Sequence, residues 1–239
     1  MERQRTNDNP PRRRRGRPRD RDRARAFGAV WHSSRLITAA DVAELKAALE
    51  ATDAKYAFGL HDQDEARDHL QAGLRYPTQR DLAVVQAARP AGLQTEVFAY
   101  GRLPLAYSAR CFTARHYNLP KDDCQFSCLD HPDGLMLKTR ESEEFLVLNG
   151  IQTQSARVHN LIDELPRMQR MGVAVARISP QAQHTGEIVA LFDAVRQGRL
   201  APRDARAQLQ PLMPEQSCNG YWHGRPGLDL VESEALAAA

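Results

Sequence analysis

Three of the four cysteines lie close together in the sequence and are the residues best suited to chemistry. Cys111 is followed after twelve residues by Cys124 and after three more by Cys128. The stretch that contains them, RCFTARHYNLPKDDCQFSC, is rich in turn-forming Asn, Pro and Asp residues, which allow the three thiols to converge. Converging thiolates suit soft metals, so this spacing indicates a site for zinc or for an iron–sulfur cluster.

The fourth cysteine, Cys218, leaves the type of site open. A [4Fe–4S] cluster takes four thiolates, and Cys218 completes that count. Zinc sites more often carry two closely spaced cysteine pairs, and this chain has one such pair. A further alternative is that the cysteines are reduced and pack as small hydrophobic side chains without binding a metal.

Composition and charge distinguish a long folded part from an unusual N-terminal segment. Hydrophobic residues make up 42% of the 239 residues, which is enough for a hydrophobic core. Residues 1–25 hold eleven arginines against four acidic residues, a charge of +7, so the overall +3 leaves −4 for residues 26–239. We expect a disordered basic tail at 1–25, and the mildly acidic remainder argues against nucleic acid as a partner.

The sequence also indicates where the protein acts and which chemistry it lacks. It contains no run of about 18 apolar residues and no apolar secretory segment, so we predict no membrane span and a cytoplasmic location. Cysteines in a reducing compartment serve more often as metal or redox groups than as disulfides. Walker, GxGxxG and HExxH motifs are absent, so nucleotide or metallohydrolase chemistry has no local support.

Apolar periodicity predicts helices alternating with strands, and therefore an α/β fold. The expected helices cover residues 39–49, 81–88, 158–168 and 187–196, and the expected strands cover 94–100, 144–148 and 173–178. Residues 52–80 are polar and weakly periodic, and we assign no element to them. The cysteines Cys111 to Cys128 fall in a loop-rich stretch between the first two expected strands.

Several long motifs around and beyond the cysteines carry a resemblance to a known family. They are YGRLPLAYSARCFTAR at 100–115, PKDDC at 120–124 with Cys128, VLNGIQT at 147–153, RISPQ at 177–181 and CNGYW at 218–222. In this order they resemble the UbiV proteins, a branch of the collagenase-like peptidase family. The resemblance covers about residues 94–230.

The resemblance implies a fold and a function. It implies the C-terminal part of a (β/α) barrel-like fold that carries a [4Fe–4S] cluster. It also implies a heterodimer with a UbiU-like protein, contact with other proteins of the quinone-precursor pathway, and a role in oxygen-independent hydroxylation during ubiquinone biosynthesis. The alternatives are a fragment of a collagenase-like peptidase and a structural zinc-binding module, with peptidase activity the less expected outcome.

The resemblance assigns three of the cluster ligands, Cys111, Cys124 and Cys128. The family's fourth ligand precedes these three, and residues 1–93 contain no cysteine. Cys218 matches a separate motif of the family and is a weak candidate for the fourth ligand, as are His116 and His131.

This departure suggests a truncated or frame-shifted copy of the family's C-terminal half. The expected organisation is a basic tail at 1–25, a weakly patterned and partly helical segment at 26–93, the iron–sulfur domain at 94–230 and a short tail at 231–239.

Overall fold

The computed structural model describes residues 31–33, 43, 47, 55–61, 69–75, 78–89, 91–120 and 122–232. The expected basic tail at 1–25, nearly all of the helix expected at 39–49 and residues 233–239 lie outside the described residues. Among the described residues, none of the helices has the length and apolar character needed to cross a membrane.

Helices and strands follow one another in a mixed order along the described chain. The strands are β1 (Trp31–Ser33), β2 (Lys55–His61), β3 (His69–Arg75), β4 (Leu93–Tyr107), β5 (Leu135–Lys138), β6 (Glu144–Asn149), β7 (Gln152–Asn160), β8 (Val175–Ile178) and β9 (Ser217–Cys218). The α-helices are α2 (Gln79–Ala88), α3 (Phe112–His116), α4 (Leu165–Arg170), α5 (Thr185–Arg196) and α6 (Pro202–Leu209). Short 3₁₀ helices are η1 (Ser127–Asp130), η2 (Ile162–Glu164), η3 (Gln210–Leu212) and η4 (Gly220–His223).

The long strand β4 is the centre of a mixed sheet. It pairs antiparallel with β7, which continues through antiparallel β6 to β5. The short strands β8 and β9 add parallel partners to β4 and β7, which gives six strands, and β1 pairs antiparallel with the start of β4 as a seventh. Strands β2 and β3 form a separate antiparallel hairpin.

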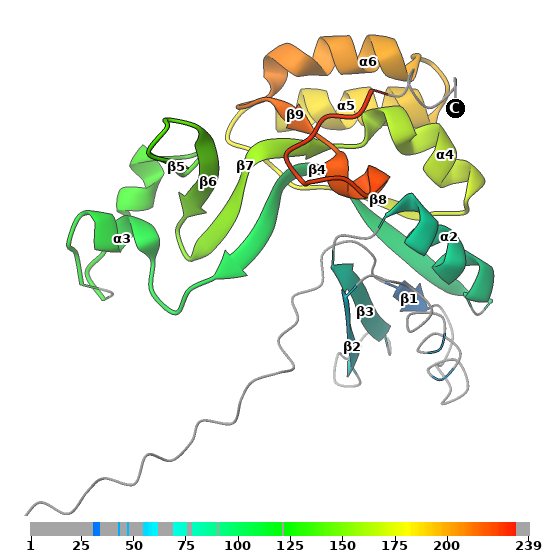
Figure 1. The fold of residues 1–239 in the computed structure, drawn as a ribbon, viewed down its shortest axis with the longest axis horizontal. Coiled ribbons are helices and arrows are strands. Elements are labelled where there is room, and N and C mark those ends of the chain that lie inside the picture. Colours follow the sequence, from blue (N-terminus) through cyan, green and yellow to red (C-terminus); the bar gives the residue numbers. More distant parts are fainter. Residues whose placement is uncertain are drawn as a thin grey trace, which may run out of the picture.

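The sequence of β4 explains its central place. Leu93, Thr95 and Val97 are buried and the intervening residues are more exposed, the alternation of a half-covered strand. Burial becomes continuous from Val97 to Gly101, which shows that both faces of this part of the strand are covered. Helices α4, α5 and α6 pack together on the sheet, and their apolar residues join those of β4 and β7 in one core (Figure 1).

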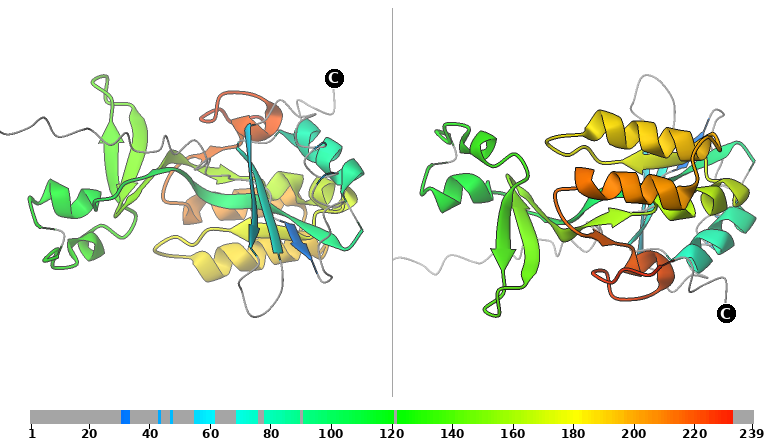
Figure 2. Two further views of the ribbon diagram at one scale, coloured as in Figure 1. Left: turned by 90° about the horizontal axis from the view of Figure 1, so that it is seen from below. Right: turned by 90° about the horizontal axis from the view of Figure 1, so that it is seen from above.

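Beyond this core, β4 and β7 run on as a two-stranded arm. The arm projects away from the helices and carries α3, β5 and β6 at its far end, as all three views show (Figures 1 and 2). The pairing changes register on both sides of Pro104, which has no backbone N–H to donate to the ladder.

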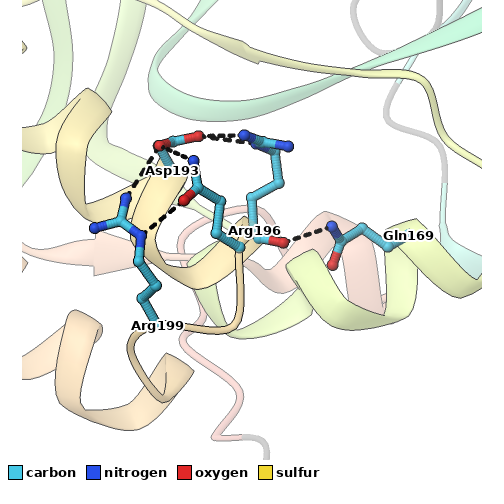
Figure 3. A network of polar contacts seen from close by, with 5 residues as sticks. Gln169, Asp193, Arg196 and Arg199 are labelled. Carbon is cyan, nitrogen blue, oxygen red and sulfur yellow. Dashed lines mark hydrogen bonds and ion pairs between the residues drawn. The ribbon is translucent and has the colours of Figure 1, made fainter.

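The end of α5 is held by a polar network (Figure 3). Asp193 accepts two hydrogen bonds from the guanidinium of Arg196, at 2.6 and 2.9 Å. It also forms an ion pair with Arg199 at 3.2 Å. Gln169 of α4 donates through Nε2 to the Arg196 carbonyl at 2.9 Å, which satisfies one of the free carbonyls of the last turn of α5 and ties the two helices together.

Most of the predicted elements within the described residues are confirmed with small changes of boundary, except that β4 continues seven residues beyond the predicted end, to Tyr107. The helices at 81–88 and 187–196 correspond to α2 and α5, and the strands at 94–100, 144–148 and 173–178 correspond to β4, β6 and β8. The hairpin β2–β3 and the elements β1, α3, β5, β7, β9 and α6 were not predicted.

The helix predicted at 158–168 is wrong. Its first residues belong to β7, and an α-helix begins only at Leu165. Val158, Leu161 and Leu165 have helical spacing, but pairing of Val158 with Arg102 of β4 holds the backbone extended. The side-chain oxygen of Asn160 then accepts a hydrogen bond from Ile162 N at 3.1 Å and begins the turn that ends the strand.

A mixed α/β architecture is confirmed, and the expected barrel-like arrangement is not seen in the part of the chain that the structure describes. A (β/α) barrel consists of consecutive parallel strands. Here the pairs β4–β7, β7–β6 and β6–β5 are all antiparallel. Short turns join β5 to β6 and β6 to β7, as is usual for antiparallel neighbours. The chain reaches the end of the arm along β4 and returns along β7, which makes this pair antiparallel as well.

The segment around Gly220 gives the first testable prediction. A Cβ atom at Gly220 would lie 1.8 Å from the Pro226 carbonyl oxygen, so we expect Gly220→Ala to lower the free energy of unfolding by about 1–3 kcal/mol. Gly186, in the first turn of α5, has open space around the same position, so Gly186→Ala is the matched control and should be neutral or stabilising by up to about 1 kcal/mol. Urea unfolding followed by circular dichroism measures both, and equal midpoints for Gly220→Ala and the unchanged protein would contradict the close approach.

Candidate functional site

Cys111, Cys124 and Cys128 lie together at the far end of the β4–β7 arm. They belong to residues 108–134, which we call the thiol lobe and which contains α3 and η1 in contact with each other (Figure 1). All three are half-buried and free of disulfides. The three thiols therefore belong to one small structural unit.

Cys111 begins the lobe by capping α3. Its Sγ accepts a hydrogen bond from Ala114 N at 3.5 Å, in the way that a Ser or Asp side chain usually caps a helix. Phe112 N donates to the carbonyl of Gly150 at 2.7 Å, which fixes the start of α3 against the turn between β6 and β7. Asn118 ends α3 in a left-handed conformation, φ 55°, the usual conformation for the residue that closes a helix.

Cys124 and Cys128 flank a strained turn. Both residues that follow Cys124, Gln125 and Phe126, have φ of 51°, a region that costs a non-glycine residue about 1 kcal/mol or more. The turn is closed by Ser127 N donating to the Cys124 carbonyl at 3.2 Å. The Phe126 side chain is 71% exposed, so burial of its ring does not compensate for this strain.

An aromatic contact joins the two parts of the lobe. The hydroxyl of Tyr117, which follows α3, lies 2.5 Å from Nε2 of His131, which follows η1, and the two rings are stacked with centroids 5.8 Å apart. His116 packs edge-on against Tyr117 on its other side. Both histidines that the sequence offers as alternative ligands therefore lie in the thiol lobe and take part in its packing.

The donor types of the lobe suit a soft metal, but the thiols do not form a finished ligand set. Within the residues that the structure describes, no three His, Cys, Asp or Glu side chains are arranged so that they could hold a metal ion. A cluster would therefore require the turn between Asn118 and Cys128 to rearrange, and we derive no chemical step through such a group.

Cys218 lies in a different part of the molecule. It is in β9, is 0% exposed, and pairs with His159 in the body of the sheet. The thiol lobe, in contrast, is attached at Gly150, close to Gln152, the first residue of β7, whereas Cys218 pairs near the last residues of β7. From Gln152 to His159 a strand covers roughly 23 Å, far more than the few ångström that separate ligands of one metal centre.

The surroundings of Cys218 keep it uncharged. Burial raises the pKa of the Cys218 thiol to about 12, although Arg157 and Arg102 act in the opposite direction. Burial also lowers the pKa of its strand neighbour His159 to about 4. At neutral pH this Cys–His pair therefore contains a thiol and a neutral imidazole, as expected for core residues.

Sequence reasoning missed Arg102. This residue lies in β4, half-buried, where the arm leaves the body of the sheet. A signal was present, because Arg102 is a lone charged residue in the largely apolar run from Val97 to Leu105, and burial lowers its pKa below the usual value for arginine.

The difference between the two kinds of cysteine predicts their reactivity. In the folded protein purified without bound metal, at pH 8, we expect iodoacetamide to modify Cys111, Cys124 and Cys128 and to leave Cys218 intact, because a thiol of pKa about 12 is ionised to only about one part in 10⁴. Peptide mass spectrometry measures each site, and labelling in urea, where all four should react, is the control. Modification of Cys218 as fast as Cys128 in the native protein would contradict this placement.

Comparison with known proteins supplies a family. No solved structure matches the chain. The model of peptidase family U32 matches residues 79–231, from the start of α2 through β9 and η4, and so includes the thiol lobe, the arm and the core. The match covers well over half of the 239 residues. The chain therefore belongs to peptidase family U32.

Proposed function

We propose that this chain is an iron–sulfur member of its family that acts in the oxygen-independent hydroxylation of a ubiquinone precursor, together with a UbiU-like partner. The observation that carries the proposal is the confinement of Cys111, Cys124 and Cys128 to one lobe, at the spacing of the cluster cysteines in the UbiV branch. The proposed cluster is a [4Fe–4S] cluster, bound by these three thiolates and a fourth donor.

The energies involved allow the lobe to form such a site. Structural zinc in zinc-finger peptides binds with about 10–16 kcal/mol at pH 7, and metal binding and local folding occur together, which gives the scale for a site built of thiolates. The strain stored at Gln125 and Phe126 amounts to a few kcal/mol at most. The backbone strain at this exposed turn is therefore small beside a binding energy of that size.

The position of Cys218 supports a site with three cysteines. Cys218 is separated from the thiol lobe by the length of β7, and its thiol has a raised pKa, so Cys218 is disfavoured as a thiolate ligand. The fourth donor would then come from the lobe, from a partner or from a small molecule, and His116 and His131 are candidates within the lobe. An iron with a labile or non-thiolate fourth ligand is more reactive and more easily lost than one held by cysteine.

Reconstitution tests the cluster. Anaerobic reconstitution should give a brown protein with broad absorption near about 400 nm and with bound iron and sulfide. Replacement of any one of Cys111, Cys124 and Cys128 by Ala should remove most of the iron, whereas Cys218→Ala, the matched control, should retain it. Stoichiometric zinc without iron, or equal loss of iron in Cys218→Ala, would contradict the assignment.

Deletion of the gene in its own host tests the pathway. We expect ubiquinone to fall during anaerobic growth and to stay unchanged during aerobic growth, because the proposed reaction replaces an oxygen-dependent one. A Cys218→Ala copy should restore anaerobic ubiquinone and a Cys111→Ala copy should not, as quantified by mass spectrometry. Unchanged anaerobic ubiquinone in the deletion strain, or release of peptides from gelatin by the purified protein, would instead favour a peptidase role.

A further inference from the structure

A small pocket lies where the arm joins the body of the molecule. It encloses about 50 Å³ and is lined by β4, β7, the segment after β8 and residues 132–133 of the thiol lobe. A water-sized site needs about 10–15 Å³, so the pocket has room for a group the size of about four waters. It fits a compact polar group and is too small for a ring with a long apolar tail.

Arg102 supplies the charge of this pocket. Its Nη1 donates to the carbonyl oxygens of Ser155, at 3.0 Å, and Ala156. Its Nε and Nη2 make no hydrogen bond to the described residues, and none of the described carboxylates lies within 4.0 Å of the guanidinium. One edge of the guanidinium is thus fixed by backbone carbonyls, and the other is left for a ligand.

The carboxylates around Arg102 do not form an ion pair with its guanidinium among the described residues. Burial lowers the pKa of Arg102, and the carboxylates of Glu215, Asp133 and Glu144 raise it from beyond ion-pair distance. Taking a guanidinium out of water has a cost that distant, partly exposed carboxylates offset weakly, whereas an oxyanion in direct contact offsets it well.

The walls of the pocket are fixed in advance. Gln181 accepts a hydrogen bond from the buried Tyr100 hydroxyl at 2.7 Å and donates to the Leu212 carbonyl at 2.7 Å. Gly101 allows the neighbouring segment to approach, because a Cβ there would lie 2.5 Å from the Cβ of Ser179. Rigid walls reduce the ordering cost of binding.

The pocket also lies at the carboxyl end of a parallel strand, where ligands commonly bind. Strand β8 runs parallel to β4, and Ser179 to Gln181 follow directly after its last residue, Ile178. Ligands of open α/β sheets bind beyond the carboxyl ends of parallel strands. The amides of Asn149 and Gln154 complete a polar lining on the side of the arm.

We propose that this pocket binds the oxyanion group of a small ligand, a carboxylate or a phosphate, with Arg102 as its counter-charge. A planar guanidinium edge presents two N–H groups in parallel, which matches the two oxygens of either group. The remaining polar atoms of Asn149, Gln154 and Ser179 are placed to bind substituents next to the oxyanion. The proposal does not depend on the presence of a cluster.

Ligand-induced stabilisation is the first test. Acetate and inorganic phosphate are the probes, with acetamide as the neutral counterpart of acetate at equal ionic strength. We expect at least one anion to raise the melting temperature in a saturable way and acetamide to have no effect. The stronger of the two anions identifies the group. No stabilisation by either anion, or equal stabilisation by acetamide, would overturn the proposal.

Two variants locate the effect. Arg102→Gln should weaken anion binding at least tenfold in isothermal titration, and Arg102→Lys should weaken it less, because lysine keeps the charge and loses the paired donors. Arg157→Gln is the control, since Arg157 lies on β7 outside this pocket and binds the Leu228 carbonyl at 2.6 Å. Equal affinity of Arg102→Gln and the unchanged protein would overturn the proposal.

A chemical test avoids dependence on folding of the variants. Phenylglyoxal modifies accessible arginines, and mass spectrometry reports each one. We expect the bound anion to slow modification of Arg102 at least fivefold and to leave Arg157 unaffected. Equal rates at Arg102 with and without the anion would contradict binding at this residue.

Discussion

Antiparallel pairing of β4 with β7 is the interaction on which the rest of the structure depends. It runs from Tyr100 and Asn160 in the core to Tyr107 and Gln152 at the end of the arm. At the core end, the two strands contribute Val97, Ala99 and Val158 to the cluster of buried residues covered by α4, α5 and α6. The same ladder thus anchors the arm in the most heavily buried part of the molecule, where its hydrogen bonds are best protected from water.

The lobe and the pocket take their positions from this ladder. The thiol lobe begins directly after β4 and is attached beside the turn that precedes β7, through Ser108 N to the Ile151 carbonyl at 2.8 Å and Phe112 N to the Gly150 carbonyl at 2.7 Å. Arg102 lies between the lobe and the core. A weak contact, Ala182 N to Asp133 Oδ1 at 3.4 Å, joins the lobe to the segment after β8 across the pocket.

Apolar spacing and turn residues in the sequence predicted the elements whose formation depends on interactions between residues close together in the chain. Helix α2 follows from its apolar spacing, although its Thr78–Asp81 capping box starts it at Gln79, before the predicted residue 81, and β6 follows from the run before Asn149–Gly150. The end of β7 could not be predicted in this way, because Val158 shares helical spacing with Leu161 and Leu165, and its strand partner Arg102 lies more than 50 positions earlier in the sequence. The start of β7 instead pairs with the adjacent β6.

In the candidate site, too, features that depend on residues close in the sequence could be predicted, and features that depend on tertiary contacts could not. Spacing predicted that Cys111, Cys124 and Cys128 share one region, because they are separated by few residues and many turn formers. The count of four cysteines could not show that Cys218 lies beside His159, since β9 joins the sheet only through tertiary contacts. The pocket around Arg102 was hidden for the same reason, because its walls come from segments between residues 101 and 214.

The register changes at Pro104 have a mechanical consequence. Pro104 has no N–H and the ladder shifts register on either side of it, and a strand with such an irregularity bends and twists locally, so this point sets the direction in which the arm leaves the body. Pro132 and Asp133 belong to the lobe, whereas Ser179 and Gln181 follow β8 in the body, so the shape of the arm at Pro104 sets the distance between the two sides of the pocket.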